Sequence, residues 1–160
     1  LEQAAREVRY SFLSRVARQV GATAVALGHT ADDQAATLLL HLVRGRGLAG
    51  LPGMQPARSY TGTDGMAVTL ARPLLEVGRE ETEAYGQARG LVPRRDETYW
   101  ALEIPRNYLR LEVLPLLAHL NPQVRNALGR LARSVALDLE YLESQVEGVW
   151  PLVAQPLFKI

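Results

Sequence analysis

Two polar residues one helical turn apart, His29 and Asp33, are the first candidates for chemistry in this chain. They follow a short apolar run, Ala24 to Leu27, that stops at Gly28. A helical pattern then begins, so a strand, a turn and a helix are predicted, with both polar residues on one face of the helix start. In open parallel sheets, ligands bind outside the carboxyl ends of strands, beside helix N-termini. The pattern therefore predicts a polar site at the end of a strand.

A histidine and a carboxylate at this spacing fit a metal pair, a general-base pair or a nucleotide-positioning pair. A fourth interpretation is a capped helix start with an incidental histidine, and the residues alone favour it. The zinc interpretation is the weakest, because His41 and His119 lie in helical segments with no ligand spacing toward His29. The chain also has no cysteine. We therefore assign no metal ligand.

The helix predicted over Ala31 to Val43 has an apolar side and a basic end. Its apolar side is formed by Leu38, Leu39, Leu42 and Val43. Arg44-Gly45-Arg46-Gly47 then ends the helix with two cations and begins a glycine-rich segment that extends to Gly53. A phosphate-binding loop opens a helix, whereas this segment follows one. Glycine content alone therefore does not predict a phosphate site here.

The composition is that of a globular chain without disulfide bonds. Its 160 residues suit one domain or a domain and a half, and the lack of cysteine excludes a disulfide framework. No apolar run approaches the roughly 20 residues that cross a bilayer, and the N-terminus lacks signal-peptide order. We expect a cytoplasmic protein without membrane contact. The net charge is +1, and 17 of the 18 basic residues are arginine, which we interpret mainly as genomic bias.

The order of elements predicts an α/β protein followed by helices. A helix over Glu2 to Val20, a buried strand over Thr23 to Gly28 and the next helix alternate as in a parallel sheet. Further patterns predict a hairpin over residues 58–70, a helix over 79–89 and a short strand over 91–93. Two helical segments follow over 106–119 and 122–150, and a linker over 150–160. Two apolar stripes at helical spacing mark the first and last helices: Ala5, Val8, Phe12, Leu13 and Val16, and Val124, Leu128, Leu131, Val135, Leu139, Leu142, Val146 and Val149. The second stripe is expected to be core.

The stretch from Gly28 to Met54 resembles the second signature of the tRNA(Ile)-lysidine synthases, enzymes of the PP-loop ATP pyrophosphatase superfamily. The family form is GH-x-x-DDQ-x-ET followed by RG-x-G-x-x-GL-x-GM. This chain departs from it at Ala36, where the family has Glu, and matches at Gly28, His29, Asp32, Asp33, Gln34, Thr37, Arg44, Gly45, Gly47, Gly50, Leu51, Gly53 and Met54. Other segments resemble family motifs, with Tyr99 in place of Asn: Ala5 to Tyr10, Arg72 to Leu75, Asp96 to Thr98 and Ile104 to Arg110.

The resemblance implies an α/β fold in two parts. Residues 1–96 would be the later part of a parallel-sheet PP-loop domain, of the adenine nucleotide alpha-hydrolase-like type, and residues 97–160 a helical linker that contacts tRNA. The implied reaction is a two-step ligation. ATP adenylates the C2 oxygen of an anticodon cytidine in tRNA(Ile), and the amine of free lysine then displaces AMP. ATP, Mg²⁺, tRNA(Ile) and lysine are therefore the implied cofactors and partners.

The resemblance also implies roles for individual residues. Its catalytic trio falls on Arg9, His29 and Asp33. Nucleotide or substrate binding falls on Asp32, Gln34, Arg44, Gly45 and Gly47, and tRNA binding on Arg106, Asn107 and Arg110. For the tRNA-binding set, an equal alternative is a capped helix start with ion pairs to Asp96 or Glu103.

The family's S-G-G-x-D-S loop, whose amides cradle the ATP phosphates, occurs nowhere in these residues. We expect that the chain begins inside the enzyme, that ATP and Mg²⁺ are bound mainly by the missing part, and that the fragment alone is inactive. The alternative is a non-catalytic or degenerate RNA-binding or scaffold module of the same fold. Ala36 and Tyr99 favour that alternative, whereas Arg9, His29 and Asp33 disfavour it. The oligomeric state stays open, with a homodimer among the alternatives.

Overall fold

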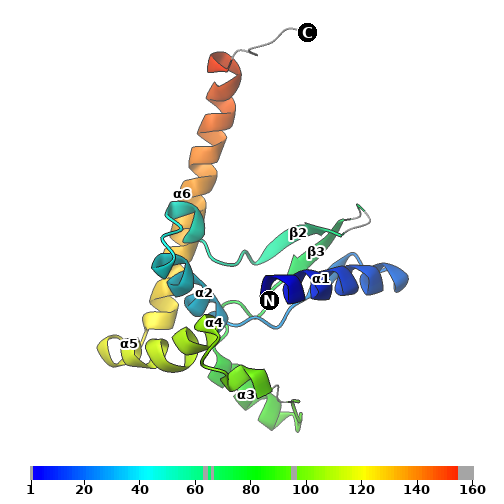
Figure 1. Ribbon diagram of the computed structural model, residues 1–160, viewed down its shortest axis with the longest axis vertical. Coiled ribbons are helices and arrows are strands. Elements are labelled where there is room, and N and C mark those ends of the chain that lie inside the picture. The colour runs from blue at the N-terminus through cyan, green and yellow to red at the C-terminus, as the bar shows by residue number, and fades with distance from the viewer. Residues whose placement is uncertain (1, 63–64, 66, 95–96, 155–160) are drawn as a thin grey trace. The chain divides into compact units, whose positions relative to one another are not determined.

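The computed structural model describes residues 2–62, 65, 67–94 and 97–154, which form two compact units (Figure 1). The first unit is drawn from Leu1–Gln34 and Met54–Trp100, and the second from Ala35–Gly53 and Ala101–Ile160. The chain passes from the first unit to the second within one helix, α2. The division into domains at residues 96 and 97 stays a prediction.

The first unit is a small mixed sheet with helices. Its sheet has the order β1-β3-β2, with β1 parallel to β3 and β2 antiparallel to it. Its elements are α1 (Glu2–Gln19), β1 (Ala24–Ala26), the start of α2 (Ala31–Val43), β2 (Ala57–Thr61), β3 (Ala67–Ala71), α3 (Arg79–Ala88) and the 3₁₀ turn η2 (Glu97–Trp100). The predicted alternation of helix, strand and helix and the predicted hairpin are confirmed.

The predicted strand before His29 is confirmed in position but not in burial. Backbone hydrogen bonds join it to β3 from Thr23 to Leu27. However, Ala24 and Ala26 are exposed, and Val25 alone is partly covered within β1. The reason is that alternate residues of a strand face opposite sides of the sheet. Val25 packs on the cluster of the first unit, whereas the face of the two alanines is uncovered among the described residues.

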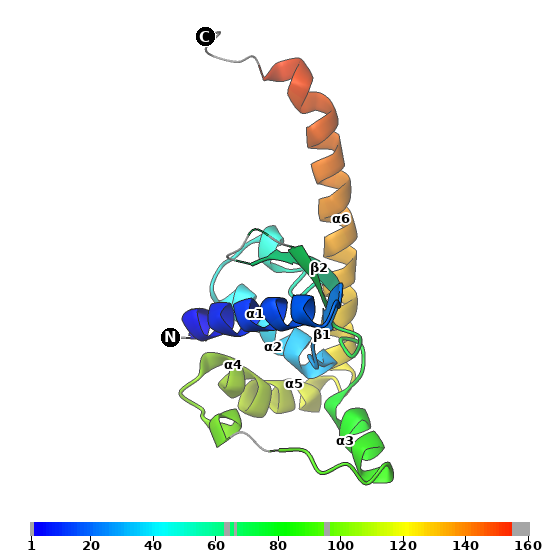
Figure 2. The same cartoon turned by 90° about the vertical axis from the view of Figure 1, so that its right-hand side faces the viewer.

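Helix α1 lies beside the sheet (Figure 2), and the core of the first unit is formed between the two. Its buried cluster consists of Tyr10, Ala17, Val68 and Leu70. Helix α1 therefore packs through Tyr10, Ser14 and Ala17, which recur at helical spacing. Of the apolar stripe noted for this helix, Val8 is 71% exposed and Phe12 is exposed as well, whereas Leu13 packs against the cluster. Small side chains at Ser14 and Ala17 let the helix approach the sheet, and Tyr10 is buried beside them.

The second unit is helical. It contains the rest of α2, the 3₁₀ turn η1 (Leu48–Gly50), α4 (Pro105–Tyr108), the π-helical η3 (Leu109–Val113), α5 (Leu114–Leu120) and α6 (Val124–Val153). Its buried cluster consists of Ala35, Ala36, Leu109 and Leu114. Leu38 is fully buried, as predicted, but Leu42 and Val43 are exposed, Val43 by 78%. The cluster is centred on the first half of α2, so the last turn of the helix extends past it.

The predicted helix over residues 106–119 is confirmed and contains Pro115, which lies in the first turn of α5. Proline removes a backbone donor and clashes with the carbonyl one turn before it. The π-helical segment η3 precedes α5, and its wider hydrogen-bonding spacing lets the helix continue around the proline. The chain therefore turns Leu109 and Leu114 to the same core without a break.

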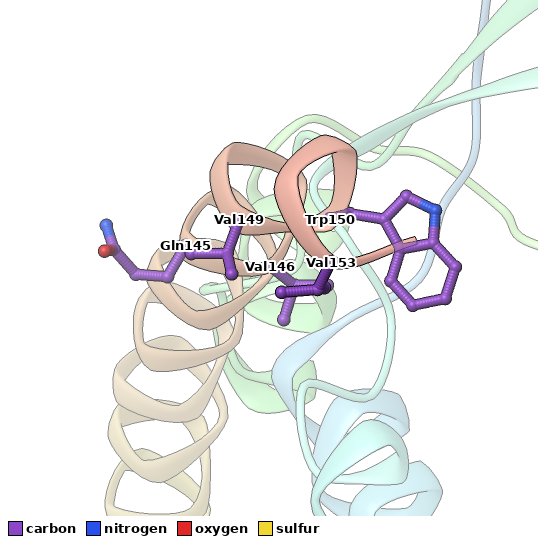
Figure 3. Close-up of a pocket in the computed structure, with 5 residues that line it drawn as sticks. All are labelled: Gln145, Val146, Val149, Trp150 and Val153. Atoms are coloured by element: carbon purple, nitrogen blue, oxygen red, sulfur yellow. The ribbon is translucent and has the colours of Figure 1, made fainter. Parts of the chain in front are cut away.

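Three further expectations for the C-terminal part were wrong. Residues 91–93 form no strand. Helix α6 continues through Pro151 to Val153, past the predicted start of the linker. Within its apolar stripe, Val135 is buried, whereas Leu131 is already 44% exposed, so the stripe is not a continuous core face. In the second half Leu142, Val146 and Val149 are exposed, and an open apolar hollow lies along this face (Figure 3).

None of the described helices combines the length and apolarity needed to cross a bilayer.

Candidate functional site

The start of α2 carries the predicted catalytic pair. His29 lies just beyond β1, at the carboxyl end of a strand that is parallel to β3, and is half-buried. Asp33 lies in the first turn of α2, where its Oδ2 accepts hydrogen bonds from the Thr30 amide (3.0 Å) and the Thr30 hydroxyl (3.3 Å). This is the bonding of a helix-capping carboxylate three residues after the cap. The predicted placement of His29 and Asp33 is therefore confirmed, and their chemical roles stay predictions.

The two neighbours of Asp33 are buried and bonded to other segments. Asp32 is 6% exposed, and its Oδ2 accepts a hydrogen bond from the Arg79 amide (2.9 Å). Gln34 is 7% exposed, and its amide group makes two bonds with Met54. The Gln34 Nε2 donates to the Met54 carbonyl (3.2 Å), and the Gln34 Oε1 accepts from the Met54 amide (2.8 Å). Three consecutive side chains thus bind backbone groups of three segments.

At the starts of α2 and α3, backbone amides already donate hydrogen bonds to acceptors of the chain itself. At the start of α2 the Ala31 amide donates to the Val77 carbonyl (3.0 Å), beside the Thr30 bond to Asp33. At the start of α3 the Gly78 amide donates to Glu81 Oε2 (2.8 Å). A phosphate cradle needs several unoccupied amides that converge on one point. These two helix starts therefore do not fit an ATP phosphate group.

Arg9 lies on α1 and is exposed, on a different element from His29 and Asp33. Its neighbour Tyr10 is a residue that sequence reasoning missed as part of a polar cluster. The Tyr10 ring has the Arg6 and Arg58 guanidinium carbons each 5.6 Å from its centroid. Burial raises the pKa of the Tyr10 phenol, but the charges and hydrogen bonds of Arg6 and Arg72 outweigh it, so the net pKa is lowered. A sequence signal for this cluster was present, because Arg6 lies one helical turn before Tyr10.

Arg72 holds this cluster to the sheet. It is buried, and its Nη1 donates to the Gln55 carbonyl (2.6 Å). Burial lowers the pKa of the Arg72 guanidinium, and the Tyr10 phenol partly offsets that effect. A buried guanidinium is stable only where acceptors satisfy it. The arginine of the predicted Arg72 to Leu75 motif is therefore an internal link between α1 and the end of β3.

The glycine-rich segment after α2 is held by its own helix. Three of its glycines, Gly45, Gly47 and Gly53, have positive φ angles of 64°, 61° and 64°, a conformation that favours glycine. His41 Nδ1 is hydrogen-bonded to the Gly50 carbonyl (2.5 Å). Arg44 and Arg46 are exposed. The segment therefore presents two cations on a backbone that few other residues could adopt.

Gly50→Ala is expected to destabilise the protein by about 1–3 kcal/mol through overpacking. A Cβ at this position would lie 2.5 Å from Arg46 Cβ and 3.3 Å from His41 Cβ. Chemical denaturation measures the effect. The matched control is Gly129→Ala in α6, where a Cβ meets open space and should stabilise the helix by roughly 0.5–1 kcal/mol. Equal effects of the two substitutions would contradict the close packing around Gly50.

The predicted tRNA-binding residues are brought together in the second unit. Arg106 Nη2 donates to the Thr37 hydroxyl (2.8 Å), and Arg110 Nη2 donates to Asn107 Oδ1 (3.0 Å). Asn107 is buried, and its Nδ2 donates to the Ala101 carbonyl (3.0 Å). These bonds are internal to the unit, and α4 has no side-chain cap, so they leave the role of the set in tRNA binding open. Of the two expected ion-pair partners, Asp96 lies outside the described residues.

The two departures from the family pattern have local packing partners. Ala36 is fully buried in the cluster with Leu109 and Leu114, so a small apolar side chain fits this position. Tyr99 lies under the Arg79 guanidinium, with the Arg79 Cζ 4.2 Å from the ring centroid. Among the described residues, no group of three or more His, Asp and Glu side chains gathers where a metal ion could bind.

The fold and these motifs match a known class. A model of the PP-loop domain matches residues 1–117, and the chain therefore belongs to the PP-loop domain family. The U34-tRNA thiolase NcsA from Methanococcus maripaludis, solved with its [4Fe-4S] cluster, shares the fold with a TM-score of 0.55. The match covers 80% of this chain and 41% of the thiolase at 18% identity, so it supports the fold alone.

Curated relatives of the chain are tRNA(Ile)-lysidine synthases. The Dehalococcoides mccartyi protein is 48% identical over 132 residues, which cover 82% of this chain and 28% of that protein. The Geobacter sulfurreducens protein is 47% identical over 92% of this chain and 30% of its own length. The Salinispora tropica protein is 46% identical over 97% of this chain and 45% of its own length. The chain thus spans less than half the length of these relatives.

Proposed function

We propose that this chain contributes to an enzyme that ligates lysine to the anticodon cytidine of tRNA(Ile), with ATP, through an adenylated tRNA intermediate. The observation that carries the proposal is the 48% identity to a tRNA(Ile)-lysidine synthase over 82% of the chain. The placement of His29 and Asp33 beyond a parallel strand supports it, because ligands of open parallel sheets bind at that edge. The first 96 residues would complete the nucleotide-binding domain, and residues 97–160 would form the tRNA-contacting part.

The proposed catalytic residues are Arg9, His29 and Asp33. In adenylation the C2 oxygen of the cytidine attacks the α-phosphorus of ATP and pyrophosphate leaves, so negative charge develops at the phosphates. The lysine amine loses its proton in the second step, when it displaces AMP. His29 is a histidine, the side chain that acts most often as a general acid or base. Asp33 is oriented by its two bonds from Thr30, so its position is set before substrate arrives. Arg9 supplies a cation that counters the developing charge.

The proposal also assigns residues that bind nucleotide, substrate and tRNA. Arg44, Gly45 and Gly47 would contact nucleotide or substrate through the exposed basic loop. Arg106, Asn107 and Arg110 would contact the tRNA backbone, where arginine forms the stronger phosphate fork. Free lysine is the second substrate. A cytoplasmic enzyme is proposed, and a homodimer is the assembly state to test by light scattering.

ATP use follows from membership of the PP-loop family. When bound, Mg²⁺ would neutralise charge on the phosphates. The starts of α2 and α3 do not fit the phosphates. We therefore propose that the phosphate cradle lies in a part of the enzyme outside these residues, and no step is assigned to the metal here. These 160 residues alone should accordingly bind ATP weakly and lack activity.

The test uses the full-length protein with radiolabelled lysine and tRNA(Ile). We expect ATP-dependent incorporation of lysine into the tRNA, and no incorporation into a tRNA(Ile) transcript whose anticodon cytidine is replaced by uridine. Tight tRNA binding without ATP-dependent incorporation would contradict the ligase and favour a non-catalytic RNA-binding module.

A further inference from the structure

We propose that Asp32 and Gln34 are positioning residues. They hold two neighbouring segments against the start of α2 and so keep His29 and Asp33 in place, instead of contacting the nucleotide. Both residues belong to the matched Asp-Asp-Gln motif, whose residues were first assigned to substrate contact or catalysis. The inference rests on the proposed function for its kinetic consequence, but its structural part stands on hydrogen bonds within the first unit.

Asp32 ties α2 to the segment that begins α3. Its Oδ2 accepts from the Arg79 amide at 2.9 Å, across 47 positions of sequence. Arg79 is the first residue of α3, so the carboxylate satisfies one of the amides that a helix start leaves without an intrahelical partner. The negative charge also faces the positive end of the α3 dipole. The adjacent bond from the Ala31 amide to Val77 joins the same two segments.

Gln34 ties α2 to the end of the glycine-rich segment. Its side-chain amide donates to the Met54 carbonyl and accepts from the Met54 amide, as a strand neighbour would. Met54 is buried, so an unsatisfied backbone group there would be costly. The pairing needs a donor and an acceptor at once. Among side chains of this length, only glutamine supplies both in this geometry.

The three consecutive side chains point in three directions, since neighbours on a helix are turned by about 100°. Asp33 points back to Thr30 and caps its own helix. Asp32 and Gln34 bind the segments on either side. The start of α2, which carries Asp33 and lies two residues after His29, is thus joined to two other segments by the side chains of Asp32 and Gln34. Loss of one anchor should disturb the orientation of the pair without removing a contact to ATP.

The experiment compares conservative and disruptive substitutions in the full-length protein. Asp32→Asn keeps an oxygen that accepts from the Arg79 amide, whereas Asp32→Ala does not. Gln34→Glu is nearly isosteric but cannot donate to the Met54 carbonyl, and its charge would face that oxygen. Amide hydrogen exchange at residues 54 and 79, single-turnover lysidine formation and the KM for ATP are measured for each variant.

We expect Asp32→Ala to speed exchange near residue 79 and to slow the single-turnover rate, each by about tenfold or more, with little change in the KM for ATP. Asp32→Asn should recover most of both losses. Gln34→Glu should behave like Gln34→Ala, with faster exchange near residue 54. Glu80→Ala, which removes an exposed carboxylate one residue further into α3, is the control and should leave exchange near residue 79 unchanged.

A nucleotide-binding role predicts the opposite result, namely a changed KM for ATP and unchanged amide exchange. In that case Asp32→Asn would raise the KM for ATP as much as Asp32→Ala, and exchange near residue 79 would stay at the wild-type rate. Either result overturns the inference for Asp32, and wild-type behaviour of Gln34→Glu overturns it for Gln34. If Asp32→Ala does not fold, the KM and exchange of Asp32→Asn decide between the roles. If the wild-type protein forms no lysidine, the proposed function fails, while the exchange pattern still decides whether the anchors exist.

Discussion

His29→Ala and Asp33→Ala should each slow the formation of adenylated tRNA by roughly 10²- to 10⁴-fold, which is the usual cost of removing a positioned acid, base or charge-stabilising group. Binding of tRNA should stay nearly intact, because its affinity comes mostly from phosphate contacts spread over other residues. The measurement is single-turnover lysidine formation by the full-length enzyme with saturating tRNA, beside filter binding.

Asp33 needs a second variant, because its carboxylate also caps α2. Loss of a capping residue costs about 1 kcal/mol, so part of the effect of Asp33→Ala is structural. Asp33→Asn keeps an oxygen that accepts from Thr30 and removes the charge. If the charge acts in the chemical step, Asp33→Asn should be nearly as slow as Asp33→Ala while retaining wild-type stability.

Arg110→Ala is the contrasting variant. It should weaken tRNA binding and reduce its salt dependence more than it lowers the chemical rate, because each phosphate contact contributes counterion release. Filter binding at two salt concentrations measures this. Should His29→Ala and Asp33→Ala keep wild-type turnover and lose tRNA affinity instead, the start of α2 would be an RNA-docking surface and the catalytic assignment would be wrong.

Leu114→Ala should lower the free energy of unfolding by about 2–5 kcal/mol, as large-to-small substitutions in a core do. Leu114 is 1% exposed and packs in the buried cluster with Ala35, Ala36 and Leu109. The two alanines cannot extend to fill the space left by the lost side chain, so the cavity term should be near its full size.

Leu116→Ala is the matched control on the same helix. Leu116 is 65% exposed, so the same change in chemistry removes little buried area. It should cost less than about 0.5 kcal/mol, which is usual for surface positions. Urea denaturation of both variants gives the comparison. A similar loss in the two would mean that the π-helical segment lets the core collapse into the space that the Leu114 side chain leaves.

Some parts of the fold followed directly from local sequence patterns. Gly28 ends an apolar run before a helical pattern, and this predicted both the strand end and the start of α2. Turn glycines predicted the β2–β3 hairpin and the end of α3 at Gly90. These signals act over a few residues, because caps and turns depend on backbone angles and near neighbours. Local chemistry was therefore sufficient to predict them.

The buried faces of the helices did not follow from local pattern. Helix α1 offers two stripes at helical spacing, one through Val8 and Phe12 and one through Tyr10 and Ala17. Hydrophobicity favoured the first, but the second is buried, because Arg6, Arg58 and Arg72 surround the Tyr10 ring and phenol. Two of these arginines come from β2 and the end of β3. A periodicity search along one helix contains no information about them.

For the site, the sequence by itself determined which residues stand at the end of β1 and that they follow the lysidine synthase pattern. Only the tertiary structure decided what their neighbours bind. Asp32 bonds to Arg79 and Gln34 to Met54, residues 47 and 20 positions away. The physical reason is that a buried polar side chain is stable only with a partner, and the partner depends on which backbone groups the fold brings to it. The motif identifies the polar side chains, whereas the tertiary structure determines which backbone groups they bind.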